Sequence, residues 1–170
     1  METERLILRS FEEKDLDDLY DYLSNPEVVK YEPYRAMNRE ETKDNLNFRI
    51  TCDEFIAVEL KDTHKVIGNI YFGHRDFNTM ELGYVFNYKY QKQGYATEAC
   101  QAVIADAFAR NTHRIFAECD PQNTNSWHLL EKLGFAREAH IKENVYFWTN
   151  ENGKPIWKDT FMYSLLNPNR

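Results

Sequence analysis

The sequence predicts an α+β fold with about seven strands and four helices in one domain. Short runs of β-branched and aromatic residues are interleaved with longer segments whose apolar residues recur at helical spacing, which indicates a mixture of strands and helices. The 170 residues fit one domain, and no linker, repeat or low-complexity segment divides residues 1–170.

The N-terminal part begins with a strand at residues 5–9. A helix follows, with Ser10 as its predicted N-cap and Glu13 as the partner in a capping box. The helix ends before Pro26, and a second helix is predicted from Arg39 to about Arg49. The apolar face of the first helix consists of Leu16, Leu19, Tyr20 and Leu23.

Three strands are predicted in the middle of the chain, at residues 55–60, 66–72 and 80–86. The turn at 61–64 joins the first two into a hairpin. Side chains alternate along the third strand, which gives it two distinct faces. One face carries Met80, Leu82, Tyr84 and Phe86, and the other carries Glu81, Gly83 and Val85.

The C-terminal half alternates between the two types of element. A one-sided apolar stripe predicts a helix over 97–109, and a strand follows at 114–119. Asn123 or Asn125 caps a further helix, which Gly134 ends. Two final strands are expected at 135–147 and 156–166, with Asn152-Gly153 as the turn between them.

The composition excludes several classes of function. A net charge of -7 argues against nucleic acid as a partner, although it suits either plain solubility or a cationic acceptor. The three cysteines are far apart and form no CxxC pair, so neither a disulfide framework nor a metal site is expected. No basic leader or apolar run of membrane-spanning length occurs, which predicts a cytoplasmic protein without a membrane partner.

The loop at residues 91–96, Gln-Lys-Gln-Gly-Tyr-Ala, lies between a predicted strand and a predicted helix. Backbone N–H groups at a helix start are unpaired, and the helix dipole adds partial positive charge. Gly94 lacks a Cβ and lets the backbone approach a ligand closely. The loop therefore predicts a bound phosphate or pyrophosphate.

These features together resemble the GNAT superfamily of acyltransferases. The loop fits the family pattern (Gln/Arg)-x-x-Gly-x-(Gly/Ala), and the order Asn123, helix, Gly134-Phe135 fits a later one. Within the superfamily the chain is most similar to the branch of bacterial ribosomal-protein N-terminal (Rim-type) acetyltransferases. The similar residues are 4–9, 94–99, the pair Asn123 and Ser126, 157–159 and 163–166. The resemblance implies a three-layer fold with a mostly antiparallel twisted sheet that is splayed between strands four and five.

The resemblance also implies a binding site for acetyl-CoA. Backbone groups of the 94–97 segment would hold the pyrophosphate, residues 91–93 would border it, and the Val85-Phe86 segment would pair with pantetheine. Asn123 would bind the pantetheine amide, cap its helix, or do both. The expected cofactor residues are Val85, Phe86, Gln91, Lys92, Gln93, Gly94, Tyr95, Ala96, Thr97, Asn123 and Ser126.

For catalysis, the resemblance suggests Glu81 as general base, acting through a water. The alternative for Glu81 is a surface carboxylate or salt-bridge partner. Many members carry a tyrosine acid four residues before the glycine of Gly-Phe, where this chain has Leu130. Ser126 is the expected substitute, and its alternative role is helix capping. Acids and aromatics suited to a cationic amine either line the acceptor site or serve packing. They are Tyr31, Glu32, Tyr34, Glu143 and Tyr146.

The expected function is transfer of an acetyl group from acetyl-CoA to a primary amine by direct attack in a ternary complex. The acceptor is a protein N-terminus or, as the alternative, a polyamine, amino acid or antibiotic. A non-catalytic CoA-binding sensor is the rival from another class. Either a monomer or a homodimer is compatible with the sequence.

Overall fold

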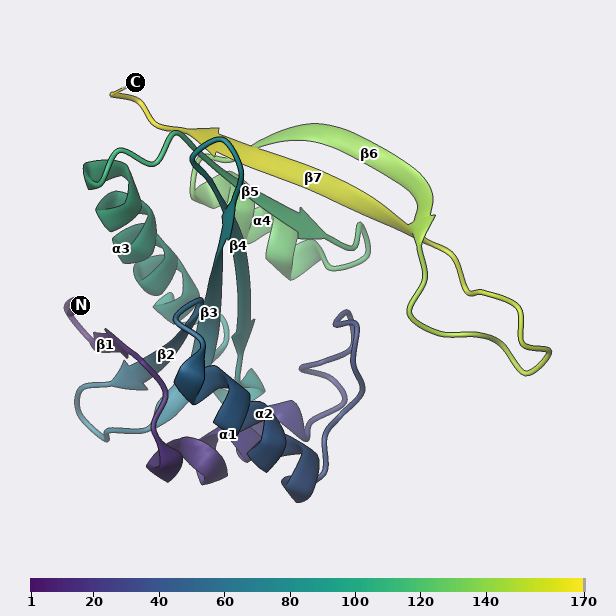
Figure 1. Ribbon diagram of the computed structural model, residues 1–170, viewed down its shortest axis with the longest axis horizontal. Coiled ribbons are helices and arrows are strands. Elements are labelled where there is room, and N and C mark those ends of the chain that lie inside the picture. Colours follow the sequence, from purple (N-terminus) through teal and green to yellow (C-terminus); the bar gives the residue numbers. More distant parts are fainter. Residues whose placement is uncertain (170) are drawn as a thin grey trace.

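The computed structural model describes residues 1–169 and contains one seven-stranded sheet with the order β1-β2-β3-β4-β5-β7-β6 (Figure 1). All neighbouring strands pair antiparallel except β4 and β5, which are parallel. This confirms the predicted mixed and mostly antiparallel sheet. The strands are β1 Leu6–Arg9, β2 Phe55–Leu60, β3 Val66–Arg75, β4 Thr79–Phe86, β5 Arg114–Cys119, β6 Ala136–Val145 and β7 Lys158–Leu166.

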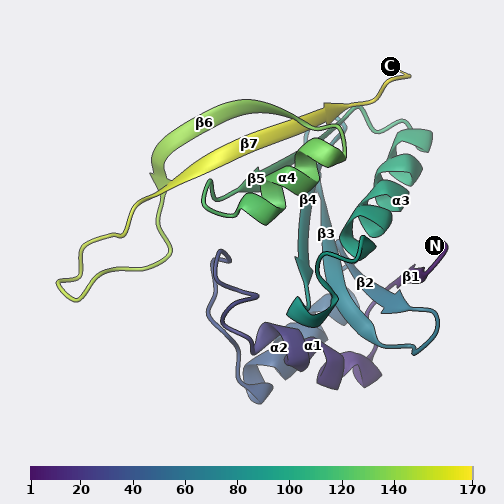
Figure 2. The ribbon, with the colours of Figure 1, turned by 180° about the vertical axis from the view of Figure 1, so that it is seen from behind.

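Helices cover both faces of the sheet, which gives three layers (Figures 1 and 2). The helices are α1 Leu16–Leu23, α2 Arg39–Thr51, α3 Tyr95–Ala109 and α4 Thr124–Lys132. One core packs α1 and α2 against Ala57, Val66 and Val85. The other packs α3 and α4 against the opposite face, with Ile70 and Ile115 among its buried residues. Alternate residues of β4 therefore belong to different cores, with Leu82 and Phe86 in the core under α3 and α4 and Val85 in the core under α1 and α2.

The two parallel strands separate part of the way along their length. Pairing between β4 and β5 runs from Thr79↔Arg114 to Glu81↔Phe116 and then stops, although β4 continues to Phe86 and β5 to Cys119. Beyond Glu81 the edge of β4 that faces β5 has no strand partner within residues 1–169. This opening is the predicted splay, and it leaves backbone polar groups available to a ligand.

The predicted cap of the first helix was wrong. A short 3₁₀ turn at Glu13–Asp15 precedes α1, and the Glu12 N–H donates to Asp15 Oδ2 at 2.8 Å, so a box of Glu12 and Asp15 replaces the predicted box of Ser10 and Glu13. Asp15 is buried and accepts two further bonds from Arg9, at 2.7 and 2.8 Å. The buried ion pair with Arg9 holds Asp15 in place, so the helix begins at Leu16.

The last two strands form an arm that extends beyond the rest of the sheet (Figures 1 and 2). Both strands are shorter than predicted, because β6 ends at Val145 and β7 begins at Lys158. The turn around Gly153 exists, with a φ of 72° and a bond from its N–H to Asn150 O. It closes a loop outside the ladder, where only one isolated bridge joins Thr149 and Pro155.

Candidate active site

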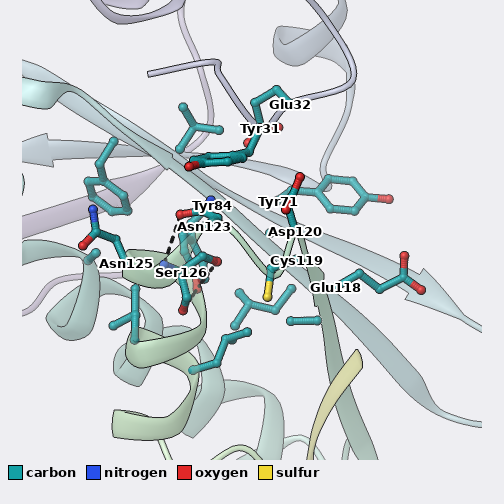
Figure 3. Close-up of a pocket in the computed structure, with 18 of the residues that line it drawn as sticks. Tyr31, Glu32, Tyr71, Tyr84, Glu118, Cys119, Asp120, Asn123, Asn125 and Ser126 are labelled. Atoms are coloured by element: carbon teal, nitrogen blue, oxygen red, sulfur yellow. Dashed lines mark hydrogen bonds between the residues drawn. The ribbon is translucent and has the colours of Figure 1, made fainter. Parts of the chain in front are cut away.

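A cavity of about 1080 Å³ occupies the splay and extends toward the loop between α1 and α2. Its walls include the ends of β4 and β5, the start of α3 and the start of α4. Tyr31 and Glu32, from the loop before α2, lie on the opposite side from Asn123 and Ser126 (Figure 3). Fourteen residues predicted for the site line this cavity, namely Tyr31, Glu32, Tyr34, Glu81, Val85, Phe86, Gln91, Lys92, Gly94, Tyr95, Ala96, Thr97, Asn123 and Ser126.

The loop before α3 opens the helix start toward the cavity. Gly94 is the N-cap and has a φ of 85°, a conformation that L-residues with a side chain rarely adopt. The first backbone bond of the helix runs from the Glu98 N–H to Gly94 O at 3.0 Å. The N–H groups of residues 95–97 come before this bond and have no partner within the helix. They form a site for an anion at the positive end of the α3 dipole.

A pair of hydroxyl groups lies on the α4 side of the splay. The Tyr84 hydroxyl donates to the Ser126 carbonyl oxygen at 2.9 Å, and it lies 3.0 Å from Ser126 Oγ, a contact in which either hydroxyl can be the donor (Figure 3). Burial raises the pKa of Tyr84 far above its usual value, so this phenol stays protonated and acts as a donor. Leu130, where the family often has a tyrosine, is buried in the core. Tyr84 and Ser126 therefore provide the hydroxyl groups at this wall of the cavity, where Leu130 provides none.

Two carboxylates lie on the opposite face of the sheet at the same point. Glu81 pairs with Phe116, and Glu118 is two residues further along β5, so both side chains share the face that α1 and α2 cover. Glu81 is engaged in an ion pair with Arg75, which also bonds the Tyr71 hydroxyl at 3.0 Å. The salt-bridge role that was the alternative for Glu81 is therefore present in the structure.

Glu118 differs from Glu81 in having no ion pair or hydrogen bond to its carboxylate within the described part of the chain. The Glu118 side chain is exposed to solvent on one side. Partial desolvation by the surrounding protein raises the pKa of Glu118, and the negative charge of Glu81 raises it further. A free carboxylate with a raised pKa at the edge of a cavity is the form that a general base takes.

The far end of the cavity lies under the loop between α1 and α2. Burial raises the pKa of Glu32 to about 7, while Arg49 and the Tyr34 hydroxyl oppose this shift by favouring the ionised form. The Tyr31 hydroxyl donates to Gln122 O at 3.1 Å and so connects this loop to the segment before α4. Aromatic and titratable groups therefore surround this end of the cavity.

Three predicted site residues lie outside the cavity lining. The Gln93 side chain turns back to donate to Lys89 O at 3.0 Å. Glu143 stands at the irregular part of β6 with a φ of 45°, and its N–H donates to Asp159 Oδ1 at 2.9 Å. Tyr146 packs edge-on against Trp157 in the loop of the arm, with a ring separation of 5.1 Å. The early end of β6 at Val145 leaves Tyr146 outside the strand on which it was predicted to act, whereas Glu143 stays within the strand.

Glu118 and Arg49 are cavity residues that the sequence reasoning did not identify. For Glu118 a signal existed, because it is a lone charge in the apolar run Ile115–Cys119. For Arg49 none existed, since a basic residue near a helix end usually faces solvent. Its burial depends on how α2 packs over β2.

Residues 1–169 contain no group of three metal-ligating side chains of the His, Cys, Asp or Glu type. Within the same range, no helix combines the length and apolar character needed to cross a bilayer. All three cysteines are free, and burial raises the pKa of Cys119, which lines the cavity, to about 11.

Comparison with known proteins places this geometry in a family. The model of the acetyltransferase (GNAT) domain matches residues 5–136. The uncharacterized N-acetyltransferase YnaD of Bacillus subtilis (strain 168) is 37% identical over 96% of this chain and 95% of its own. The [ribosomal protein uS5]-alanine N-acetyltransferase of Escherichia coli (strain K12) is 27% identical over 98% and 90%. The crystal structure of an acetyltransferase (GNAT family) from Bacillus anthracis has a TM-score of 0.88 and 34% identity, covering 98% of both chains. With the splayed sheet and the open helix start, these matches show that the chain belongs to the GNAT acetyltransferase family.

Proposed function

We propose that the protein, as one acyltransferase domain over residues 1–170, transfers an acetyl group from acetyl-CoA to a primary amine by direct attack in a ternary complex. The observation that carries this proposal is the splay itself. It has the unpaired N–H groups of the α3 start at one end, a free carboxylate on one face and a pair of hydroxyls on the other.

Acetyl-CoA binding is supported by the chemistry of the cavity wall. The pyrophosphate suits the N–H groups of residues 95–97, and the unpaired edge of β4 from Gly83 to Phe86 offers backbone partners to the pantetheine arm. Gln91 Nε2 donates to Phe86 O at 3.1 Å and holds the loop against the end of that strand. Asn123 accepts from the Ser126 N–H at 3.3 Å, so it caps α4 while lining the cavity.

Proton removal from the attacking ammonium is assigned to the two carboxylates. Glu118 accepts the proton, directly or through a water, because it is the carboxylate without a cationic partner. Glu81, neutralised by Arg75, keeps the pKa of Glu118 raised without adding a second full negative charge. The role first predicted for Glu81 is therefore shared between the two residues.

Transfer then proceeds across the splay. The amine nitrogen, which has given one proton to Glu118, forms a bond to the thioester carbonyl carbon, the C–S bond breaks, and the electron pair leaves with sulfur as the CoA thiolate. The second proton that the nitrogen loses as it becomes an amide N–H passes to solvent, or through water to the thiolate. Ser126 Oγ donates a hydrogen bond to that thiolate, and Tyr84 fixes the direction of the Ser126 hydroxyl. An acyl-cysteine intermediate is disfavoured, because a thiol with a pKa of about 11 is rarely ionised near neutral pH.

The test is acetyl-CoA turnover, read by release of free thiol, against pools of small amines and N-terminal peptides. Glu118→Gln is expected to lower kcat/KM by about 100-fold or more, the range for loss of a general base, and Glu81→Gln by less. The matched control is Glu40→Gln, which removes an exposed carboxylate on α2 outside the cavity. Tight acetyl-CoA binding without turnover in any pool would favour a sensor, and no binding would contradict the proposed function.

A further inference from the structure

The Arg49 guanidinium is an incompletely bonded cation in the cavity wall. Its side chain is 3% exposed, and it lines the cavity from α2. Its Nε donates to Asn45 Oδ1 at 2.6 Å, but its Nη1 has no hydrogen-bond partner in the range 1–169. A buried donor without a partner costs roughly 1–3 kcal/mol, and more when it is charged. Such a group is retained more readily where a ligand completes its bonding.

The charge around Arg49 is not balanced by the protein. No carboxylate of the described residues forms an ion pair with it. Phe55 and Phe11 lie 4.5 and 5.3 Å from the guanidinium carbon, measured to the ring centroids, and stabilise the cation only in part. Glu32 is the carboxyl that interacts with this charge, but burial raises its pKa to about 7, which weakens its negative charge near neutral pH. The guanidinium is always charged and has no ion pair within the described residues, so it presents an unpaired positive charge to this end of the cavity.

The strand register gives the distance of this cation from the reaction centre. Phe55, beneath the guanidinium, pairs with Tyr71, and Tyr71 pairs with Gly83, two residues beyond Glu81. Phe55 and Gly83 are thus two strand spacings apart, which is roughly 10 Å. A group bound at Arg49 is separated from the reacting amine by about the length of three residues of extended peptide.

We propose that the acceptor carries a carboxylate or carbonyl oxygen roughly 10 Å from its amine, and that this oxygen completes the hydrogen bonding of Arg49. This inference rests on the proposed acetyl transfer and names its acceptor class, an extended peptide N-terminus. A polyamine of the same length is disfavoured, because its second ammonium would meet the guanidinium. Nη1 is covered in the free protein, so binding of the oxygen requires a small shift of the Arg49 side chain.

The first experiment compares two probes of equal length with the wild-type protein. The probes are 8-aminooctanoate, whose far end is a carboxylate, and 1,8-diaminooctane, whose far end is an ammonium. We expect kcat/KM for the amino acid to exceed that for the diamine by about tenfold or more, as for a charge-assisted bond in a partly buried site. Triglycine and triglycine amide then distinguish a terminal carboxylate from a peptide carbonyl. Preference for the diamine would overturn the inference.

The second experiment removes the cation. Arg49→Gln should raise KM for 8-aminooctanoate and triglycine by about tenfold, leave kcat nearly unchanged, and abolish the discrimination against the diamine. Arg49→Lys should retain part of the discrimination, because it keeps the charge. Arg39→Gln is the matched control, since Arg39 is an exposed arginine of the same helix paired with Asp17.

The outcomes separate this inference from the proposed function. An equal loss for both probes in Arg49→Gln would indicate a structural role and overturn the inference while leaving the transferase intact. Acetyl-CoA affinity, measured by titration calorimetry, should not change in any Arg49 variant. If Arg49→Gln does not fold, the ratio of kcat/KM for the two probes with the wild-type protein still tests the inference. Absence of turnover with every amine would contradict the transferase proposal, and the inference with it.

Discussion

The Tyr84 hydroxyl lies 3.0 Å from Ser126 Oγ and 2.9 Å from the Ser126 carbonyl oxygen, linking the middle of β4 to the first turn of α4 across the splay. Tyr84 belongs to the face of β4 that packs with Leu82 and Phe86 against α3 and α4, whereas Glu81 belongs to the other face. Glu118, the proposed base, shares the face of Glu81, so it and the hydroxyl pair are on opposite sides of the sheet, and the reacting thioester is expected between them.

Removal of either hydroxyl should affect the leaving thiolate. Ser126→Ala is expected to lower kcat by about 10- to 100-fold, somewhat below the loss of an oxyanion-hole donor. Tyr84→Phe should lower kcat less, and the double variant should be no slower than Ser126→Ala, because Tyr84 acts through Ser126. The control is Tyr20→Phe, on α1 outside the cavity lining.

The ionisation of bound CoA provides a second measurement for this pair. If Ser126 donates to the sulfur, the thiol of enzyme-bound CoA should titrate at higher pH in Ser126→Ala and in Tyr84→Phe than in wild type, followed by thiolate absorbance. Equal titration in all three proteins, or strictly additive losses of kcat, would assign the pair a structural role.

The acid limb of the pH–rate profile should report Glu118. The charge of Glu81 raises the pKa of Glu118, so Glu81→Gln should move the acid limb of kcat/KM to lower pH. Arg75→Gln leaves the Glu81 charge unneutralised and should move the limb to higher pH. The measurement is kcat/KM from about pH 5 to 9 for the three proteins. Shifts in the same direction for both variants would contradict the assignment.

Much of the fold could be predicted because it depends on local patterns. The apolar run of β2 and its turn, and Gly94 before α3, are each determined within a few residues. The Asn123 cap and Gly134, with a φ of 89°, likewise bound α4 as predicted. The Ser10 cap failed because Arg9 and Asp15 form a buried ion pair, a tertiary preference that outweighs a local one.

The site was less predictable where it depends on contacts distant in sequence. The pKa of Glu118 is raised by the surrounding protein and by the charge of Glu81, which lies near it because β4 and β5 pair in parallel. Arg49 enters the cavity because α2 packs over Phe55. Glu143 and Tyr146 do not line it, although Asn144, Val145 and Phe147 of the same segment do, because Glu143 has a positive φ and Tyr146 packs on Trp157. Each of these facts is a property of packing rather than of a local pattern.

Glu32 should make the stability of the protein depend on pH. Its pKa is about 7 when folded and near 4.5 when unfolded, so the folded state retains the proton longer. The stability linked to the protonated form is fully present below about pH 4.5 and is lost as the pH rises through 7. Glu32→Gln should therefore be more stable than wild type at pH 8.5, by roughly 1–3 kcal/mol, and similar at pH 4.5.

Urea unfolding at the two pH values measures this difference, with Glu40→Gln as the exposed control on α2. A variant that is equally stable relative to wild type at both values would show that Glu32 is not desolvated in solution.

Alanine variants of Gly94 and Gly153 distinguish two effects of an added Cβ, which are backbone strain and obstruction of a bound ligand. Both have a positive φ, at 85° and 72°, so an alanine at either position should cost about 1–2 kcal/mol in unfolding free energy. A Cβ at Gly94 would face only the end of the Arg5 side chain, 3.3 Å away, and a Cβ at Gly153 would meet nothing within 4 Å. Calorimetric titration with CoA should show about tenfold weaker binding for Gly94→Ala, because its methyl group stands where the pyrophosphate approaches. Gly153→Ala should bind CoA like wild type, and equal affinities in both variants would argue that the pyrophosphate does not lie at the start of α3.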